Sequence, residues 1–221
     1  MMPPNETDAK YMAPVYPARV ASGAAQGCSC RGAYLTTEEG HRVIDSISSW
    51  WVITHGHRHP KIVAAIKAQA DILDQVIFAE YTHEPAEQLA AKLLTLAPEG
   101  LEHVFFSDSG STSIEVALKA AMGFWRHTGE ARHRIVVMEH SYHGDTIGTM
   151  SVGARGPFTD AYEPLLFDVE RIPFPALGHE DATLDAFEGV CRRGDVAALL
   201  VEPLCSVPAG CSCIRRPYSR A

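Results

Sequence analysis

Short apolar segments alternate with helical patterns in the second half of the sequence, and this alternation restricts the fold most. HVFFSD at 103–108, RIVVMEH at 134–140 and AALLVEP at 197–203 are predicted strands, and helical patterns cover 111–127 and about 181–192. These strands are too apolar to face water, and strands that alternate with helices usually pair in parallel. We therefore expect an α/β fold whose mainly parallel sheet is covered by helices on both faces.

The first half of the sequence contains an irregular start, a hairpin and two helices. Residues 1–32 are rich in Pro, Gly, Ala and Ser without a sustained period, which predicts an arm or loop. Two short strands are expected around a turn at Glu39 and Gly40. Apolar residues at helical spacing predict helices over 61–73 and roughly 84–96.

Charge and hydropathy exclude several classes of protein. The 221 residues include 19 basic and 27 acidic ones, with a net charge of −8 and no run of Lys or Arg, so we expect no nucleic-acid partner. No apolar stretch approaches the length of a membrane span, and MMPPNETDAK lacks the pattern of a signal peptide. We therefore expect a cytoplasmic protein that does not bind a membrane.

Cysteines and histidines do not predict a metal site. Six cysteines in a chain of this length are not a disulfide scaffold, and the two Cys-x-Cys pairs lack the wider spacing of structural zinc sites. A zinc-binding module is the reading that these pairs leave open. We expect His55, His57 and His59 to be loop and turn residues and no metal to be bound.

The turn SDSGS at 107–111 joins a predicted strand to a predicted helix. Gly110 permits a tight backbone path, and Ser111 and Thr112 place hydroxyls beside the unpaired amides of the helix, which attract an anion such as phosphate. The alternative is a plain helix cap with Glu115 nearby, which stabilises a helix by about 1 kcal/mol without a ligand. Both readings stay open for this stretch alone.

The segment HSYHGDT at 140–146 follows the next predicted strand and therefore projects from the same sheet edge. An aromatic side chain with a histidine and an acid suits a flat cofactor ring beside a phosphate. Alone, the segment is equally consistent with a turn that Asp145 caps, and Asp145 is also a candidate for fixing the loop that carries Tyr142. Two such loops on one edge favour a ligand site.

Four motifs together carry a resemblance to a known family. SSWW, HGHRHP, SDSGSTSIEVALKAA and SYHGDTIGTMSV occur in this order, and residues 33–204 resemble the adenosylmethionine–8-amino-7-oxononanoate aminotransferases of biotin synthesis, a branch of the class III aminotransferases. The resemblance implies the fold type I of pyridoxal 5′-phosphate (PLP) enzymes. It further implies an arm and small-domain segment at 1–59 and an incomplete PLP-binding large domain, with a mainly parallel sheet, at 60–204.

The resemblance also implies roles for particular residues. The phosphate of PLP would be bound by Gly110 and Ser111, and the cofactor ring would be stacked by Tyr142 near the acid Glu202. The residues implied at the substrate are Trp50, Trp51 and, outside its usual sequence context, Tyr11. Neighbouring residues on a strand face opposite ways, so at least one tryptophan should point away from any single core.

The activity implied by the resemblance is transfer of an amino group from S-adenosylmethionine to 8-amino-7-oxononanoate, giving 7,8-diaminononanoate, by a homodimer. Two alternatives stay open. One is another class III aminotransferase acting on ω-amino acids. The other is a non-catalytic phosphate-binding α/β module.

Catalytic residues of the family are not found in this sequence. PLP transamination needs a lysine that binds the cofactor and an acid at the pyridine nitrogen. The motif of the acid is absent, and none of the lysines resembles the cofactor-binding lysine of the family. These lysines are Lys10, Lys61, Lys67, Lys92 and Lys119. Both belong to the part of the family sequence that follows Glu202. We therefore expect an inactive fragment with no catalytic residue of its own.

Residues 205–221 depart from the family pattern LVxGAGGMxxY and are rich in Cys, Arg, Pro and Ser. A back-translation of residues 204–218 with one base inserted after the first codon encodes LVLGAGGMLMYPP. We therefore expect 205–221 to be an out-of-frame tail that ends at an accidental stop or at the edge of the sequenced DNA.

Overall fold

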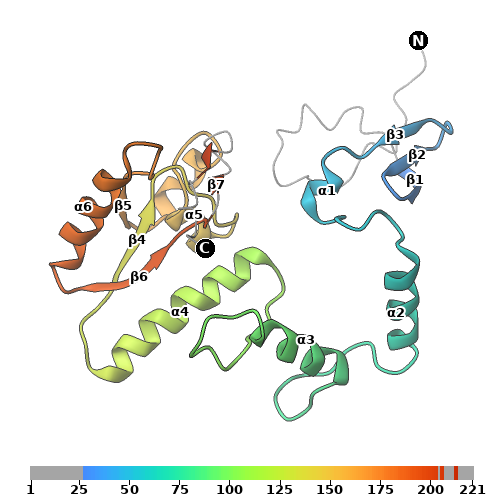
Figure 1. The fold of residues 1–221 in the computed structure, drawn as a ribbon, viewed down its shortest axis with the longest axis horizontal. Helices are drawn as coiled ribbons and strands as arrows, with labels where there is room; N and C mark the ends of the chain where they lie inside the picture. Colours follow the sequence, from blue (N-terminus) through green and yellow to red (C-terminus); the bar gives the residue numbers. More distant parts are fainter. Residues whose placement is uncertain (1–26, 204, 207–211, 214–221) are drawn as a thin grey trace, which may run out of the picture. The chain divides into compact units, whose positions relative to one another are not determined.

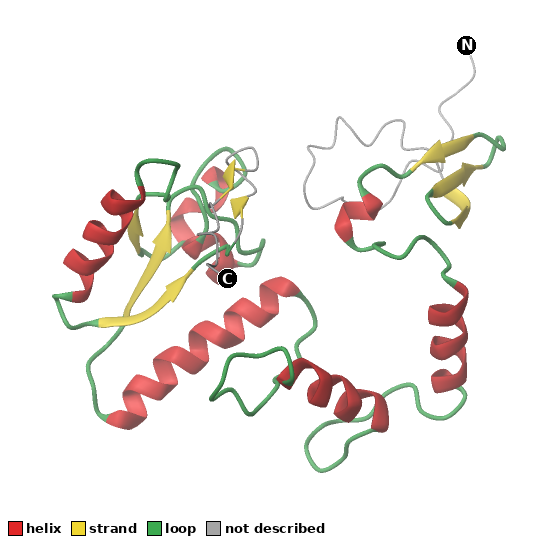
Figure 2. Ribbon diagram, in the orientation of Figure 1, coloured by secondary structure: helices red, strands yellow, loops and turns green. Residues whose placement is uncertain are grey.

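The structure is a computed structural model, and it describes residues 27–203, 205–206 and 212–213. Contacts divide the chain into two compact units, residues 1–104 and 105–221, which are taken separately below. The elements of each unit are labelled in Figure 1 and coloured by type in Figure 2. The division at residue 59 that the sequence suggests stays a prediction.

The first unit contains a small antiparallel sheet in the order β1-β2-β3. Its strands are β1 (Gly27–Arg31), β2 (Tyr34–Thr37) and β3 (Arg42–Ile44). The predicted hairpin of β2 and β3 is confirmed, with Gly40 at a φ of 82° in the turn. The expectation of an arm or loop is wrong for β1, because this strand pairs with β2 although its small and polar residues show no apolar alternation.

In its described part, residues 27–104, the first unit also contains the helices α1 (Ser48–Trp51), α2 (Pro60–Ala70) and α3 (Glu84–Leu94). The two predicted helices are confirmed, each ending a few residues earlier than expected. Pro60 occupies the first turn of α2, where its missing N–H costs nothing, and His83 Nδ1 accepts a hydrogen bond from Ala86 N–H at the start of α3. Among the described residues, no helix has the length and apolarity that crossing a membrane requires.

The second unit is built on a parallel sheet in the order β5-β4-β6 (Figure 1). Its strands are β4 (Arg134–Met138), β5 (Glu170–Ile172) and β6 (Val196–Leu200), and its helices are α4 (Gly110–Thr128), α5 (Ile147–Val152) and α6 (Glu180–Cys191). A 3-10 helix covers Asp160–Leu165, and β7 (Cys205–Ser206) pairs with β8 (Ser212–Cys213). The predicted parallel α/β sheet is confirmed.

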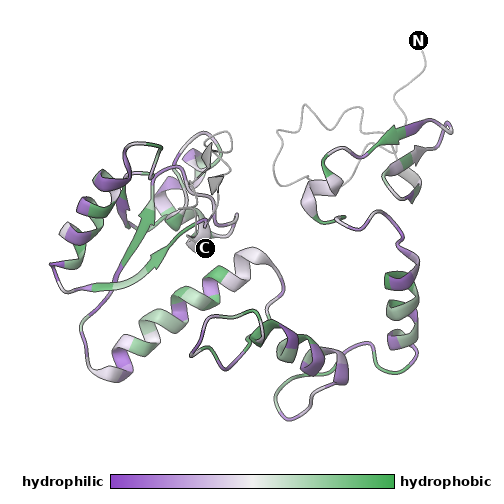
Figure 3. Ribbon diagram, viewed as in Figure 1, coloured by the Kyte–Doolittle hydropathy of each residue, from purple (hydrophilic) through white to green (hydrophobic). Residues whose placement is uncertain are grey.

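Side chains of β4 alternate between two apolar clusters, one on each face of the sheet. The first cluster joins β4 to α4 and α5 through Ile135, Val137, Leu118 and Val152, and the second joins it to β5 and α6 through Val136, Ile172 and Val190. The apolar character of β4 and β6 is visible in Figure 3. A strand buried on both faces explains why the sequence of β4 is continuously apolar rather than alternating.

The strand predicted at 103–108 is wrong. These residues have no regular structure, and Phe105 is 76% exposed. The boundary between the two units falls inside this segment, after Val104. An apolar run forms a strand only beside a pairing partner, and the sheet in the described part of the second unit consists of β5, β4 and β6 alone.

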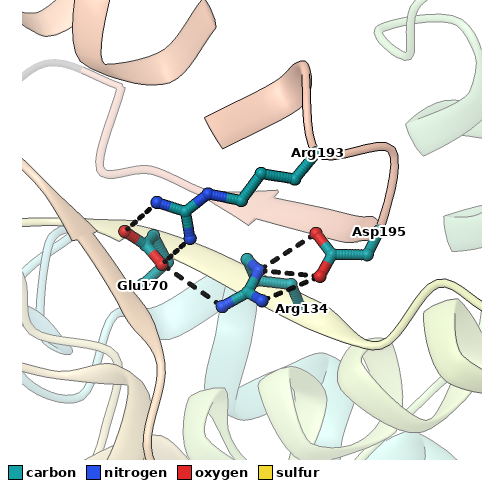
Figure 4. Close-up of polar contacts among 4 residues, drawn as sticks. All are labelled: Arg134, Glu170, Arg193 and Asp195. Carbon is teal, nitrogen blue, oxygen red and sulfur yellow. Dashed lines mark hydrogen bonds and ion pairs between the residues drawn. The ribbon is translucent and has the colours of Figure 1, made fainter. Parts of the chain in front are cut away.

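A network of ion pairs ties the amino ends of the three parallel strands together (Figure 4). Arg134 donates two hydrogen bonds to Asp195 through Nε (3.0 Å to Oδ1) and Nη2 (2.7 Å to Oδ2), and Nη1 lies 3.3 Å from Glu170 Oε2. Arg193 Nη1 donates to the same Glu170 oxygen at 2.8 Å. The hydrogen bond to Asp195 raises the pKa of Arg134, and that from Arg134 lowers the pKa of Asp195.

We expect Arg134→Met to lower the melting temperature of the second unit by several degrees, because Asp195 and Glu170 lose the cation that they share. Arg192→Met is the matched control, since Arg192 is 76% exposed and pairs only along its own helix with Glu188. Thermal unfolding followed by circular dichroism measures both shifts. Equal shifts would show that the network adds no more than an exposed pair.

Candidate functional site

The helix α4 begins with a capping box. Ser109 Oγ accepts a hydrogen bond from Thr112 N–H at 3.1 Å, and Thr112 Oγ1 accepts one from Ser109 N–H at 2.8 Å. The capping interpretation of this turn is therefore correct. It does not exclude the anion interpretation, because the amides of Gly110 and Ser111 have no partner inside the helix.

The space beside Gly110 is open. A Cβ atom built on Gly110 meets no atom within 4 Å, so protein packing does not fill this position. The helix behind it is 19 residues long, and its dipole places partial positive charge at this end. An open pair of amides at the positive end of a long helix is the donor set that a phosphate requires.

The loop after β4 connects the ends of two neighbouring strands. Tyr142 N–H donates to Glu202 Oε2 at 3.0 Å, and Glu202 lies two residues after the end of β6. The hydroxyl of Tyr142 donates to Asp145 Oδ2 at 2.8 Å, so Asp145 does fix the tyrosine inside its own loop. The aromatic ring, which is 43% exposed, is thereby held at the carboxyl edge of the sheet.

The same loop docks on the start of α4. Asp145 N–H donates to Ser111 Oγ at 3.2 Å. Gly144 has a φ of 130°, and a Cβ built there lies 3.0 Å from Ser111 Cα and 2.8 Å from Ser111 Cβ. Only glycine fits this approach, because a side chain would meet both the contact and a backbone conformation that L-residues rarely adopt.

Glu115 makes a second link between α4 and the following loop. Its Oε1 accepts hydrogen bonds from Thr146 Oγ1 at 2.6 Å and from Gly148 N–H at 2.9 Å. The sequence placed Glu115 near the cap of α4, which is wrong, because it lies six residues after the cap residue Ser109, beyond the first turn. It stabilises the start of α5 instead.

His143 contributes a polar atom without a protein partner. Among the described residues, its Nε2 is buried and has no hydrogen-bond partner. Burial lowers the pKa of His143, and the nearby Glu202 carboxylate opposes that shift. The imidazole is therefore neutral at pH 7, and a ligand with polar groups would satisfy the nitrogen. The sequence predicted that a histidine of HSYHGDT suits a cofactor ring without specifying which one, and it assigned no role to Gly144.

The structure brings together the four predicted cofactor residues, all of which lie in the second unit. Gly110 and Ser111 at the start of α4, Tyr142 in the loop and Glu202 after β6 form one chain of contacts in the second unit. The tryptophan pair belongs to the first unit. Tyr11 lies outside the described residues, so its predicted role stays a prediction.

Trp50 and Trp51 lie on a left-handed helical turn. Residues 48–51 have φ values of 49°, 46°, 65° and 67°, a conformation that costs about 1–2 kcal/mol per residue other than glycine. The expectation of a strand here is wrong. The rings are 51% and 61% exposed with centroids 5.7 Å apart, so the expectation that at least one tryptophan avoids the core is confirmed.

The histidines of HGHRHP make different contacts, and the rings of His55 and His59 lie edge to face with centroids 6.3 Å apart. His57 Nε2 lies 2.8 Å from Asp45 Oδ2, and His55 Nδ1 lies 3.0 Å from Thr54 Oγ1. Within the described ranges, no group of three or more His, Cys, Asp or Glu side chains is arranged to hold a metal ion.

The pKa of Tyr142 provides a test of the loop. Burial, then the hydrogen bond and charge of Asp145, raise this pKa to about 12 from 10.0. The protonated phenol is thus favoured in the folded loop, and its stabilisation is complete below pH 10 and is lost as the pH rises through 12. The difference between spectrophotometric titrations of the chain and of Tyr142→Phe isolates this group. We expect Asp145→Asn to lower its pKa, and an ordinary pKa in the unmodified chain would contradict the loop geometry.

Comparisons with known proteins identify the family of this chain. A sequence profile of the family described as "Aminotransferase class-III" matches residues 24–218. The chain belongs to the class III aminotransferases. This family uses pyridoxal 5′-phosphate, so the expected cofactor of the family is confirmed.

Two curated relatives of this class III chain carry the name adenosylmethionine-8-amino-7-oxononanoate aminotransferase. The protein from Synechococcus elongatus is 47% identical over 196 residues, which cover 85% of this chain and 45% of the relative. The protein from Nitratidesulfovibrio vulgaris is 40% identical over 194 residues, covering 81% of this chain and 36% of the relative. The chain therefore spans less than half the length of these relatives.

Solved structures of class III enzymes share the fold. The aminotransferase of the same name from Methanocaldococcus jannaschii matches with a TM-score of 0.80 at 27% identity, over 89% of this chain and 45% of that one. An amine transaminase from an uncultivated Pseudomonas species in its PLP-bound form matches with a TM-score of 0.78 at 27% identity, over 88% and 48%. The predicted PLP fold type I is confirmed for the matched part.

Proposed function

We propose that the second unit of this chain binds pyridoxal 5′-phosphate at the carboxyl edge of its sheet. The observation that carries the proposal is the linkage of three segments far apart in sequence. Glu202 accepts from the backbone of Tyr142, and the Tyr142 loop donates to Ser111 beside the open amides of α4. Family membership supplies the identity of the ligand.

Each residue of this edge has a distinct proposed task. The amides of Gly110 and Ser111 bind the phosphate, and Tyr142 packs its exposed ring against one face of the cofactor. Glu202 holds the backbone of Tyr142 in place, and neutral His143 offers a nitrogen to a polar group of the ligand. When bound, the cofactor supplies an electron sink for the carbon that bears the amino group.

We further propose that the parent enzyme moves the amino group of S-adenosylmethionine to 8-amino-7-oxononanoate, giving 7,8-diaminononanoate. The names and identities of the relatives from S. elongatus and N. vulgaris support this substrate pair. On the family resemblance, the proposal includes a cytoplasmic homodimer in which Trp50, Trp51 and Tyr11 contact substrate.

The chain of 221 residues is proposed to lack transaminase activity. The described residues of the second unit hold a single lysine, Lys119, which is exposed on α4. It lies nine residues after Gly110, about 13 Å along the helix axis, and is not directed to the sheet edge by any contact. The lysine that completes the site would have to come from a segment of the family sequence that this chain does not cover.

Two measurements test these proposals in order. Isothermal titration of the 221-residue chain with pyridoxamine 5′-phosphate, which has no aldehyde to react with surface lysines, tests cofactor binding alone. For the reaction, the chain is extended with the segment of the S. elongatus relative beyond the matched part. We expect 7,8-diaminononanoate with S-adenosylmethionine as the donor and not with simple amines. Equal rates with an ω-amino acid would favour another class III substrate, and no binding in the first measurement would overturn the cofactor site.

The reading frame of residues 205–221 is a separate proposal. We infer a frameshift after codon 204, because one inserted base restores a continuous family-like pattern through a string that otherwise lacks an apolar period. Sequencing the coding DNA across codon 204 tests it. A coding sequence in which no single inserted base restores the pattern would overturn it.

A further inference from the structure

The left-handed backbone of the turn at 48–51 must be stabilised by contacts with residues outside the turn. Trp51 N–H donates to Ile47 O and Ile53 N–H donates to Ser48 O, both at 2.9 Å. Such local hydrogen bonds do not explain the handedness, because a right-handed turn closes similar bonds at lower energy for L-residues. A strained backbone persists only where the surrounding structure determines it.

Asp45 provides contacts that reach this turn from outside. Its Oδ2 accepts a hydrogen bond from Ser49 Oγ at 2.7 Å and lies 2.8 Å from His57 Nε2. Its carbonyl oxygen accepts from Ser48 N–H at 3.2 Å. The side chains of Asp45 and His57 are only 6% and 10% exposed, so water competes little for these bonds.

Both sides of this contact are anchored to the small sheet. Asp45 N–H donates to Ala33 O at 2.9 Å, directly after β3. His57 exchanges two backbone hydrogen bonds with Gly32, at 2.7 and 3.0 Å, beside β1. Asp45 and His57 are therefore both fixed to the small sheet by backbone hydrogen bonds. The turn at 48–51 lies between them in the chain.

We propose that Asp45 is the positioning residue that imposes the left-handed turn and so sets the direction of Trp50 and Trp51. The functional consequence of this inference rests on the proposed contact of Trp50 and Trp51 with substrate. A right-handed turn at the same place would rotate both rings away from their present positions. Asp45 thereby acts on the substrate through the tryptophans, without touching it.

The charge of Asp45 suits this role. Hydrogen bonds from the backbone and side chain of Ser49, with that of His57, lower the pKa of Asp45 to about 2. The carboxylate is therefore ionised at neutral pH. An ordinary N-cap aspartate accepts from a backbone amide two or three residues ahead, whereas Asp45 also binds a hydroxyl four residues ahead and an imidazole twelve residues ahead.

The test compares Asp45→Ala, Asp45→Asn and Ser49→Ala in the full chain. Two indole rings 5.7 Å apart give an exciton couplet in circular dichroism, which Trp50→Phe assigns to the pair. We expect Asp45→Ala to abolish the couplet and to speed hydrogen exchange of residues 48–53 about tenfold or more, while residues 34–44 keep their protection. Asp45→Asn, which keeps one acceptor, should retain part of the couplet.

Asp74→Asn is the control for this test, and Ser49→Ala decides if the sheet unfolds. Asp74→Asn removes a charge from an aspartate whose side chain accepts from Gln75 N–H, and it should leave the couplet unchanged. If Asp45→Ala unfolds the sheet as well, Ser49→Ala decides, since it removes one donor only. An unchanged couplet and unchanged exchange in Ser49→Ala and Asp45→Asn would overturn the proposal. Neither measurement uses substrate, so failure of the proposed reaction would be seen separately, in the product assay.

Discussion

Replacing Gly110 by aspartate is expected to weaken binding of pyridoxamine 5′-phosphate about a hundredfold or more while the chain still folds. The new side chain projects into space where no atom lies within 4 Å, and Gly110 needs no positive φ. A carboxylate in the first turn also complements the helix dipole, so α4 itself is not weakened. Two like charges about 4 Å apart repel by about 4 kcal/mol at an effective dielectric constant of 20, which is the source of the loss.

Gly110→Asn is the matched control, because asparagine has nearly the same size and no charge. We expect it to lose only a small fraction of the affinity that Gly110→Asp loses, as measured by isothermal titration of both variants. Equal losses would show that the position is limited by space rather than by the charge of a phosphate. Full affinity in Gly110→Asp would show that the phosphate is bound elsewhere.

Much of the second unit is predictable from sequence because its signals are local. The helix at Gly110–Thr128 has a capping pattern and apolar spacing, and β4 is apolar throughout because both of its faces are covered. The segment 103–108 contains the apolar run at 104–106 and is not a strand. A sequence shows that a segment is suited to burial, but pairing also depends on a neighbouring strand.

At the edge of the sheet where we propose that the cofactor binds, the sequence predicted single residues but not the hydrogen bonds that join them. Tyr142 follows β4 and Glu202 follows β6, so their presence at one edge follows from parallel pairing, whereas the strand predicted before Ser111 does not form. The donation from Tyr142 N–H to Glu202 spans 60 residues, and nothing local in the sequence specifies it. Glu115 was misplaced for the same reason, since its partners lie 31 and 33 residues away.

The turn that carries the tryptophans had no usable sequence signal. Left-handed backbone is normally indicated by glycine or asparagine, and residues 48–51 are Ser, Ser, Trp and Trp. Its cause lies in Asp45 and His57, whose contact depends on the sheet that anchors them. Strain imposed by tertiary contacts is therefore the part of this fold that local propensity cannot predict.

Replacing Gly144 by alanine is expected to detach the Tyr142 loop from α4 and to destabilise the second unit by about 2–6 kcal/mol. The added Cβ atom would lie 2.8 Å from Ser111 Cβ and closer still to Ser111 Oγ, and a φ of 130° is unfavourable for alanine. The hydrogen bond from Asp145 N–H to Ser111 Oγ would be lost with the contact. Denaturant unfolding, titration with pyridoxamine 5′-phosphate and the pKa of Tyr142 should all report the change.

Two variants separate the steric part of this effect from the backbone part. Gly178 has a φ of 82°, and a Cβ built on it meets no atom within 4 Å, so Gly178→Ala measures backbone strain alone, about 1 kcal/mol. Adding Ser111→Gly to Gly144→Ala removes two of the three close contacts and should recover part of the stability, although the loop loses its acceptor. Because the acceptor is gone, cofactor affinity should not recover with stability. If Gly144→Ala costs no more than Gly178→Ala, the close approach of the loop to Ser111 contributes nothing to stability, and the hydrogen bonds of Tyr142 to Glu202 and Asp145 suffice to hold it.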